Sequence, residues 1–395
     1  MKVFYMNIET LKKALKEETS LFANENFNIV EIGNGNINRV FRVTTCRGQT
    51  YIIKCAQKNA NISNSIRLNL TRGKTEYAYL QEISQLMPAR VPNVYAYSAR
   101  NHYIVMQDMA PEYSILQDEI ISGRRYDFLA KQLADYIAVA GYMFSDFSVV
   151  SVKKKQLQKN FFNPKLCELT ERLVFTEPFF ECENNCISDL SYDFVRKEIY
   201  SDQAVTLSAA RLKYKFMNLP QSLIHGDLHF GSVFISNKDI VIFDSEFCCF
   251  GPIGYDLGNL LAHFILHYIY AKVTHGANAE PVCLWLKQQA VCLVEEFEKS
   301  FLQKVRQDPA LMFGSDSFVQ AFLENIMRDT AGYAGTECIR RIVGLAKVSV
   351  FRFKNEIEKS QYEMQVLSVG KYLLTHFDMF ISPNIFKKQL NKLLR

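Results

Sequence analysis

The sequence has 395 residues, of which 48% are hydrophobic and 22% are charged. These fractions are ordinary for a globular protein and exclude a disordered chain, a collagen and a heptad rod. The 46 basic residues only slightly outnumber the 41 acidic residues, so the net charge of +5 gives no reason to expect a nucleic-acid partner. At roughly 150 residues per domain, the length predicts two or three globular units.

The ten cysteines are too sparse for a disulfide framework, and no two have C-x-x-C spacing. We interpret them as reduced thiols of a cytoplasmic protein. For the close pairs Cys182/Cys186 and Cys248/Cys249, metal binding or redox chemistry is the alternative. The N-terminus lacks the apolar core of a signal peptide, and the most apolar stretch, residues 257–271, is short for a bilayer span. We therefore expect no membrane partner.

The first hundred residues predict a small sheet with one helix inserted after its third strand. Hydrophobic spacing indicates an amphipathic helix over residues 8–22. The predicted strands are Asn28–Ile32, Arg39–Thr44, Thr50–Cys55, Val94–Ser98 and His102–Gln107, and the inserted helix is Thr71–Gln85. Gly33-Asn34-Gly35-Asn36 is a strong turn signal between the first two strands.

The pattern changes after Asp108 and becomes mainly helical. The predicted helices are Tyr126–Asp146, 188–217 and 283–306, and between them lies a predicted strand pair, Ser232–Ile235 and Ile240–Phe243. The sequence therefore predicts an α+β, two-lobed fold, with a β-rich lobe over residues 1–108 and a mainly helical lobe over 109–395. A cleft between two such lobes is a usual place for a ligand.

Carboxylates follow two apolar segments of the helical half. One segment runs into His225-Gly226-Asp227, and the other ends at Asp244-Ser245-Glu246. If the second strand folds back beside the first, the three carboxylates converge. Asp244 and Glu246 are then close enough to share Mg²⁺, and Asp227 can orient a hydroxyl and accept its proton, as phosphoryl transfer requires. The alternative is that each Asp is a turn residue at a strand end, but unpaired carboxylates beside an apolar strand would be costly.

The N-terminal half supplies matching groups. The turn at residues 33–38 can bring backbone amides to a polyphosphate, although a plain hairpin turn explains it equally well. Lys54 lies in an apolar strand and needs a counter-charge, for which Glu76 on the following helix is the candidate. The alternative for Lys54 is an edge lysine whose head reaches solvent.

In this order and spacing, these features resemble the protein-kinase-like superfamily of small-molecule kinases, which includes the aminoglycoside and choline kinases. Further segments resemble the 5-methylthioribose kinases within it. These segments are Gly33–Phe41, Asn163–Glu168, His225–Phe234, Gly251–Asn259 and Ile339–Leu345. The resemblance extends from the first strands past residue 345, and the pair Arg340-Arg341 is an especially specific part of it.

The resemblance implies transfer of the γ-phosphate of ATP to the anomeric 1-hydroxyl of 5-methylthioribose, a step of methionine salvage. It implies that Asp227 is the catalytic base and contacts the ribose, and that Asp244 and Glu246 hold Mg²⁺ and the phosphates. Arg340 and Arg341 would lie at the sugar and the transferring phosphoryl group, for which guanidinium forks are suited. An exposed helix face or a structural ion pair is the alternative for these arginines.

The resemblance also implies a nucleotide site, with Asn38 and Lys54 in contact with ATP and the backbone of Gln107-Asp108-Met109 against adenine. The full predicted set at ATP is Asn38, Lys54, Glu76, Gln107, Asp108, Met109, Asp244, Ser245 and Glu246. A homodimer is expected on the same ground.

Two positions and one loop depart from the related patterns. Ser232 stands where protein kinases often place a metal-binding Asn, so metal binding is assigned to Glu246. Gln107 replaces an expected acidic residue, and the loop over residues 57–64 lacks the Tyr-Val-Arg and Trp-Pro elements of the family. This loop keeps other acceptors open: ribose, 5-deoxyribose, choline or an aminoglycoside. The arginine pair disfavours a polycation. The presence of Lys54 and all the carboxylates disfavours a non-catalytic pseudokinase.

The remaining polar residues have structural interpretations. Asp256 is expected to cap a helix or brace the catalytic loop, and His225 and His229 to order that loop. His263 and His267 lie four positions apart on a predicted helix. We interpret them as core or lining histidines, with a zinc pair as the alternative.

Overall fold

The computed structural model describes residues 6–34, 38–57, 59–60, 63–307 and 313–395. The chain divides into two compact units, one of residues 1–114 with 241–248 and the other of residues 115–240 with 249–395. Residues 241–248 belong to the first unit although they are distant from it in sequence. The amide of Ile242 donates to the carbonyl oxygen of Arg90 at 2.7 Å, which fixes this segment to the first unit.

The first unit contains a five-stranded antiparallel sheet in the order β1-β2-β3-β7-β6. Its strands are β1 (Phe27–Asn34), β2 (Asn38–Thr45), β3 (Thr50–Ala56), β6 (Val94–Ser98) and β7 (Tyr103–Gln107). The helices are α1 (Ile8–Glu18) and α2 (Arg72–Leu86), and a short hairpin, β4 (Asn59–Ala60) and β5 (Ser63–Arg67), precedes α2. The five predicted strands are confirmed, but this hairpin was not predicted.

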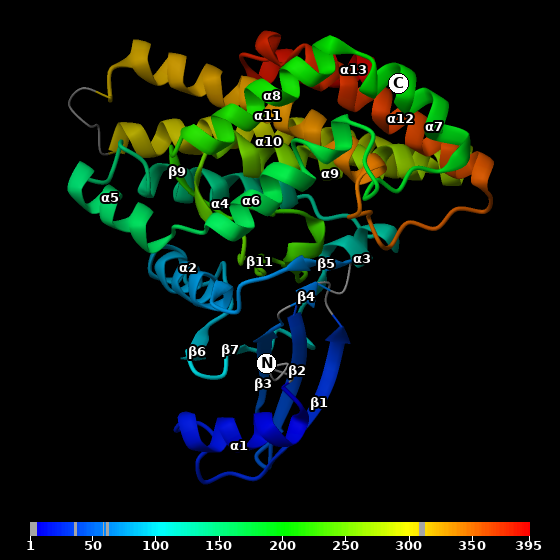
Figure 1. The fold of residues 1–395 in the computed structure, drawn as a ribbon. Helices are drawn as coiled ribbons and strands as arrows, with labels where there is room; N and C mark the ends of the chain where they lie inside the picture. The colour runs from blue at the N-terminus through cyan, green and yellow to red at the C-terminus, as the bar shows by residue number, and fades with distance from the viewer. Residues whose placement is uncertain (1–5, 35–37, 58, 61–62, 308–312) are drawn as a thin grey trace. The chain divides into compact units, whose positions relative to one another are not determined.

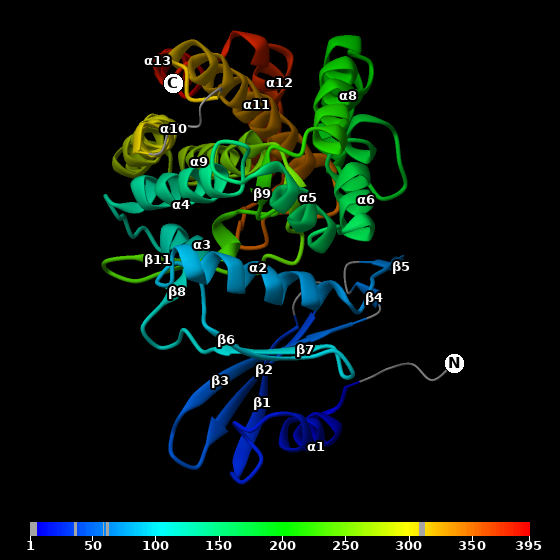
Figure 2. The same cartoon turned by 90° about the vertical axis from the view of Figure 1, so that its left-hand side faces the viewer.

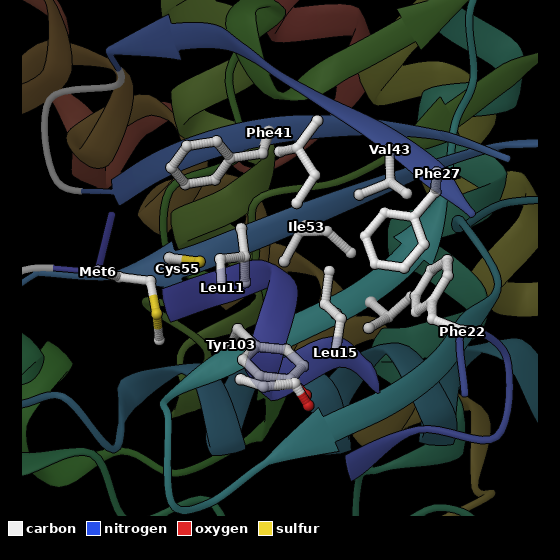
Figure 3. Close-up of a cluster of buried hydrophobic side chains, with 13 residues drawn as sticks. Met6, Leu11, Leu15, Phe22, Phe27, Phe41, Val43, Ile53, Cys55 and Tyr103 are labelled. Carbon is white, nitrogen blue, oxygen red and sulfur yellow. The ribbon is translucent and has the colours of Figure 1, made fainter. Parts of the chain in front are cut away.

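The two helices cover opposite faces of the sheet, as the two views in Figures 1 and 2 show. Successive side chains of a strand point to opposite faces. On β3, Ile53 therefore packs in the hydrophobic cluster with Leu11 and Leu15 of α1 (Figure 3), while Lys54 points to the face of α2. The alternation of β3 thus places one lysine on the α2 side of the sheet.

Helix α1 is shorter than the predicted helix over residues 8–22. The side chain of Asn7 accepts a hydrogen bond from the amide of Thr10 at 2.8 Å and begins the helix. The helix ends at Glu18, and Phe22 then packs in the same cluster as Leu11 (Figure 3). The predicted helix was too long because the turn after Glu18 also buries an apolar residue, Phe22, although this turn is not helical.

The second unit is mainly helical (Figure 2). Its helices are α3 (Leu116–Ile121), α4 (Leu129–Met143), α5 (Ser151–Asn160), α6 (Pro164–Leu173), α7 (Asp189–Val195), α8 (Gln203–Asn218), α9 (Ile253–His275), α10 (Glu280–Gln307), α11 (Asp316–Val343), α12 (Glu356–Thr375) and α13 (Pro383–Leu393). The short strands of the C-terminal half are β9 (Ser222–Ile224), β10 (Val233–Ile235), β11 (Ile240–Ile242) and β12 (Cys249–Gly251), and β8 is Ser114–Ile115.

Residues 188–217 are largely helical, as predicted, but they do not form one continuous helix. Helix α7 continues as a π-helical turn over Arg196–Tyr200, and α8 then begins anew. The side chain of Asp202 accepts from the amide of Ala204 at 2.8 Å, which caps the start of α8. An N-cap residue in the middle of a helical pattern is the signal that marks this break.

Helix α9 lies in the core of the second unit, where its residues 253–271 are buried on every side. A helix that is hydrophobic all round is typical of such a position. This confirms the core interpretation of the apolar stretch at residues 257–271. None of the helices in the described ranges is long and apolar enough to cross a membrane.

Helices α9 and α11 approach each other closely at Gly258. A Cβ atom at this position would lie 2.8 Å from the carbonyl oxygen of Thr330 and 2.8 Å from the Cβ of Tyr333. Neither neighbour can move without displacing α11, because one is a backbone atom and the other is fixed to the backbone.

We expect Gly258→Ala to lower the free energy of unfolding by about 1–3 kcal/mol, the usual cost of overpacking a core. Chemical denaturation would measure this change. Gly73→Ala in α2 serves as the comparison, because its added Cβ would meet side chains only at 3.7 Å or more. Equal stability of the Gly258→Ala variant and the wild-type chain would contradict the close approach.

Candidate functional site

The first unit holds a buried lysine between two carboxylates. The Nζ of Lys54 lies 2.8 Å from the carboxylate of Glu76 on α2 and forms a second ion pair with Asp244. We call Lys54, Glu76 and Asp244 the lysine cluster. The expected pairing of Lys54 with Glu76 is thereby confirmed, and the alternative of a solvent-reaching edge lysine was wrong.

The electrostatics of the lysine cluster keep Lys54 charged. Burial alone would lower the pKa of Lys54, but the carboxylates of Asp244, Glu76 and Glu246 outweigh this effect, and its pKa is raised above 10.5. Burial raises the pKa of Glu76, and the negative charges of Asp244 and Glu246 add to the effect. Lys54 is therefore a fixed positive charge among three carboxylates.

A second set of polar residues surrounds Glu246, which is buried. Arg72 donates from Nε to Glu246 Oε2 at 2.9 Å, and Asn38 donates to the same oxygen at 3.0 Å. The Nη2 of Arg72 also donates to the Oδ1 of Asn38 at 2.7 Å, so the three side chains are mutually bonded. We call Asn38, Arg72 and Glu246 the arginine cluster. Sequence reasoning did not identify Arg72.

Asp244 differs from Glu246 in exposure and backbone conformation. Its side chain is 46% exposed, and its φ of 66° lies in the left-handed region. Asp is among the few residues other than glycine that adopt this conformation at moderate cost. Backbone strain of this kind clusters at functional sites, so Asp244 is the carboxylate of these two clusters best placed to meet a ligand.

The two clusters bring three carboxylates, Glu76, Asp244 and Glu246, together with two cations, Lys54 and Arg72. Within the described ranges, no group of three or more His, Cys, Asp or Glu residues has the geometry of a metal site. Mg²⁺ needs only one or two protein carboxylates beside substrate phosphates, so the Asp-x-Glu pair fits it.

Two side chains of Gln107-Asp108-Met109, the segment predicted to lie against adenine, have structural partners. Asp108 forms a two-point ion pair with Arg42, with Nε to Oδ2 at 2.6 Å and Nη2 to Oδ1 at 3.2 Å. The Oε1 of Gln107 accepts from the side chain of Asn93 at 3.0 Å, and Met109 is buried. The contact of the backbone of this segment with adenine stays a prediction. Ser245 is fully buried.

The second unit holds the His-Gly-Asp loop at the end of β9. Strand β9 pairs with β12, which leads directly into α9. Both carboxylate oxygens of Asp256 on α9 accept from this loop, one from the amide of His225 at 2.6 Å and one from the amide of Gly226 at 3.0 Å. Gly226 has φ 84°, a conformation that favours glycine. Asp256 therefore braces the loop, which was one of its two predicted roles. It does not cap α9, the other predicted role.

The loop is also ordered from within. The Nδ1 of His225 accepts from the amide of Asp227 at 3.3 Å, and the Nδ1 of His229 accepts from the amide of Gly231 at 2.9 Å. The hydroxyl of Ser232 donates to the backbone carbonyl of Asp227 at 3.2 Å. The interpretation of the two histidines as loop-ordering residues is confirmed.

The carboxylate of Asp227 faces three cationic or polar side chains. Its Oδ1 lies 3.1 Å from Nη2 of Arg340 and 3.9 Å from Nη2 of Arg341, and its Oδ2 lies 3.6 Å from Nε2 of His229. Burial would raise the pKa of Asp227, but His229 and the two arginines outweigh it and hold the pKa well below 3.8. Asp227 is therefore an ionised carboxylate that can accept a hydrogen bond from a hydroxyl.

The two arginines are buried in the last turns of α11, so an exposed helix face was the wrong alternative for them. Both pair with the fully buried Glu337, three and four positions earlier on the same helix. Burial would raise the pKa of Glu337, but the arginines lower it well below 4.5. Sequence reasoning missed Glu337, although the i, i+3 and i, i+4 spacing of opposite charges was a usable signal.

His263 and His267 are buried in the core, as predicted. His263 stacks on His229 with ring centroids 5.3 Å apart, and its Nε2 lies 3.5 Å from Glu337. Burial lowers the pKa of both histidines, which are therefore neutral. Within the described ranges, neither these histidines nor the four cysteines of the close pairs belong to a group of three or more His, Cys, Asp or Glu residues that could hold a metal ion.

Some predictions fall outside these observations. Gly35, Asn36 and Ile37 of the glycine turn lie outside the described residues, as do Lys58, Asn61 and Ile62 of the loop after Lys54. The expected convergence of Asp227 with Asp244 and Glu246 stays a prediction.

Comparisons with known proteins identify the family. Residues 28–268 match the phosphotransferase enzyme family. A methylthioribose kinase of Exiguobacterium sibiricum is 31% identical over 331 residues, which is 83% of this chain and 82% of that protein. A methylthioribose kinase of Bacillus cereus (strain G9842) is 32% identical over 359 residues, which is 90% of this chain and 89% of that protein. The chain belongs to the methylthioribose kinase family.

A solved structure supports the fold of this kinase. The choline kinase of Cryptosporidium parvum Iowa II matches with a TM-score of 0.50 at 14% identity, covering 98% of this chain and 97% of that chain. At this identity the match concerns the fold alone. The predicted α+β, protein-kinase-like fold, with a β-rich N-terminal lobe and a mainly helical C-terminal lobe, is confirmed.

We expect Asp256→Ala to destabilise the kinase, because it leaves two buried backbone amides of the His-Gly-Asp loop without an acceptor. Each such group costs about 1–3 kcal/mol, so the free energy of unfolding should fall by at least about 2 kcal/mol. Urea denaturation would measure the loss.

The matched control for this prediction is Asp378→Ala. Asp378 also makes a two-point contact, with Arg211 at 2.9 and 3.2 Å, but its side chain is 59% exposed. An exposed ion pair contributes about 1 kcal/mol or less. Equal losses in the two variants would contradict the role of Asp256 as a brace.

Proposed function

We propose that this kinase phosphorylates 5-methylthioribose at its anomeric 1-hydroxyl, with ATP as the donor, to give 5-methylthioribose 1-phosphate and ADP. The membership in the methylthioribose kinase family supports the substrate. The observation that carries the chemistry is the ionised carboxylate of Asp227, 3.1 Å from a guanidinium of the buried arginine pair. This arrangement combines a proton acceptor with donors for phosphoryl oxygens.

Asp227 acts as the catalytic base in this proposal. An ionised carboxylate orients the attacking hydroxyl and accepts its proton as the bond to phosphorus forms. Arg340 and Arg341 contact the sugar and the transferring phosphoryl group, because planar guanidinium forks match charge that is spread over phosphoryl oxygens. Asp256, which holds the backbone of the loop, positions Asp227 without contacting the substrate.

The lysine and arginine clusters serve the nucleotide side of the reaction. Lys54 provides a permanent positive charge for the phosphates of ATP, and Glu76 holds its side chain in place. Asn38, Ser245 and the backbone of residues 107–109 complete the proposed ATP contacts. Asp244 and Glu246 would hold Mg²⁺, which neutralises charge on the phosphates when it is bound.

The charge of the acceptor site favours a neutral substrate. The two arginines are balanced by the carboxylates of Asp227 and Glu337, so no negative charge is in excess. A polycationic aminoglycoside would meet two guanidinium groups without a surplus carboxylate to bind it. A sugar with free hydroxyl groups can accept hydrogen bonds from the guanidinium groups and donate one to the carboxylate of Asp227.

The setting of the reaction is part of the proposal. The ten cysteines are free thiols, which is consistent with the reducing cytoplasm. The assignment of residues 1–108 to nucleotide binding and 109–395 to catalysis and sugar binding stays a prediction, and so does the homodimer.

We expect Asp227→Asn to fold normally and to lose at least about 10³-fold in turnover, which is roughly 4 kcal/mol of barrier. Asn keeps the shape of Asp but cannot accept the proton. The assay follows ADP release with 5-methylthioribose at saturating ATP, with and without Mg²⁺. Binding of ATP, measured by calorimetry, serves as the control and should remain within about twofold, since Asp227 is placed on the acceptor side. Turnover close to that of the wild-type chain would contradict the assignment.

A further inference from the structure

We propose that Glu337 is a positioning residue that sets the direction of both guanidinium groups of the arginine pair and cancels one of their two charges. This inference rests on the proposed function, because it concerns the arginines assigned there to the acceptor and the phosphoryl group. The role of Glu337 is nevertheless separate from the identity of the substrate, because it concerns how one carboxylate sets the geometry and the anion affinity of the arginine pair.

Glu337 accepts hydrogen bonds from both arginines, in each case from the Nε atom. Its Oε1 accepts from Nε of Arg341 at 2.7 Å and from Nη2 of Arg340 at 3.0 Å, and its Oε2 accepts from Nε of Arg340. A guanidinium group is planar and rigid, so fixing its Nε atom fixes the directions of its Nη atoms. One carboxylate therefore orients two forks.

In the orientation that results, the Nη2 of each arginine faces Asp227, and the Nη2 of Arg340 bonds to both Glu337 and Asp227. The Nη2 of Arg340 donates to the Oδ1 of Asp227 at 3.1 Å. Arg341 is held at two points, by Glu337 through Nε and by the carbonyl oxygen of Ala346 through Nη1 at 3.2 Å. Its Nη2 is the part of the side chain that remains for a ligand.

This Nη2 atom of Arg341 is buried and makes no hydrogen bond to any residue in the described ranges. It lies 3.9 Å from the Oδ1 of Asp227, beyond hydrogen-bond distance. A buried donor without a partner costs free energy in the free protein. A hydroxyl or phosphoryl oxygen of the substrate beside Asp227 would satisfy it, which explains why the atom is held in this position.

The charge of Glu337 also sets how strongly the site holds anions. Two guanidinium groups facing Asp227 alone would carry one excess positive charge in a buried place, where charge interactions are strong. The phosphorylated product is an anion, so such a site would release it slowly. With Glu337 the charges balance, and the neutral acceptor and the anionic product can both leave.

A buried acid on the same helix provides a matched control. Asp329 of α11 is fully buried and pairs with Lys215, with Nζ to Oδ1 at 2.5 Å. Among the described residues, Asp329 forms no hydrogen bond or ion pair with either arginine or with Asp227, so Asp329→Asn removes a buried acidic charge from α11 without touching the arginine pair. Loss of stability alone would affect both variants.

The experiment compares Glu337→Gln, Glu337→Asp and Asp329→Asn in the full chain, with 5-methylthioribose as the acceptor. We expect Glu337→Gln to lower kcat at least about 100-fold, the effect of misplacing a reacting group by about 1 Å. The KM for ATP should stay within about twofold. Inorganic phosphate, used as a probe of the arginine pair, should inhibit about tenfold more strongly, because one positive charge is no longer balanced.

The other two variants separate positioning from folding. Glu337→Asp restores the charge on a shorter side chain, so phosphate inhibition should return to the wild-type value while kcat recovers only in part. Asp329→Asn should lower the melting temperature but leave kcat and phosphate inhibition within about twofold, because the arginine pair keeps its carboxylate.

Two results would overturn the inference. One is a kcat of Glu337→Gln within about threefold of the wild-type value, and the other is an equal loss of kcat in Asp329→Asn. If the wild-type chain does not use 5-methylthioribose at all, the proposed function fails instead. In that case, calorimetry of inorganic phosphate binding to the wild type, Glu337→Gln and Glu337→Asp still tests whether Glu337 balances the charge of the arginine pair. Unchanged phosphate affinity would reject its role in balancing charge.

Discussion

The fully buried carboxylate of Glu337 is the group on which the arrangement of charged side chains around Asp227 depends. Two guanidinium groups could not remain buried side by side in the last turns of α11 without a negative charge between them, since buried charges must be paired. Because Glu337 accepts from both Nε atoms, the Nη2 atom of each arginine faces Asp227. The position of one acid on a helix thus determines what surrounds the proposed base. The same constraint operates in the first unit, where Lys54 and Arg72 are buried only in company with Glu76, Asp244 and Glu246.

The backbone that carries these groups is held by close packing and by a second buried carboxylate. Helix α9 can lie against α11 because Gly258 leaves room for the backbone of that helix. Helix α9 also carries Asp256, whose two oxygens hold the amides of His225 and Gly226, and His263, which lies between His229 and Glu337. The loop with Asp227 and the turn with the arginines are therefore both fixed to the same core helix. The chemistry requires rigid positions, and buried side chains of α9 provide them.

The sequence predicted those features that have a local signal. Alternation and turn residues indicated the strands of the sheet, and the apolar surroundings of Lys54 indicated that it needed a carboxylate. Arg72 has no such signal, because its partner Glu246 lies 174 positions away and joins it only through the folding of residues 241–248 onto the first unit. The π-helical turn at Arg196–Tyr200 was missed because the pattern around it stays helical, and the break depends on the cap at Asp202. Glu337 did have a local signal in its spacing to the arginines, but only its burial reveals that it serves both.

The central claim is that this kinase acts on 5-methylthioribose, and an acceptor panel tests it most directly. The purified chain would be assayed for ADP release with ATP, Mg²⁺ and, in parallel, 5-methylthioribose, ribose, 5-deoxyribose, choline and kanamycin. The account predicts that kcat/KM for 5-methylthioribose exceeds that for every other acceptor, with kanamycin the poorest because the arginine pair repels a polycation. Rapid turnover of another acceptor, with 5-methylthioribose inert, would contradict the account of the sugar site.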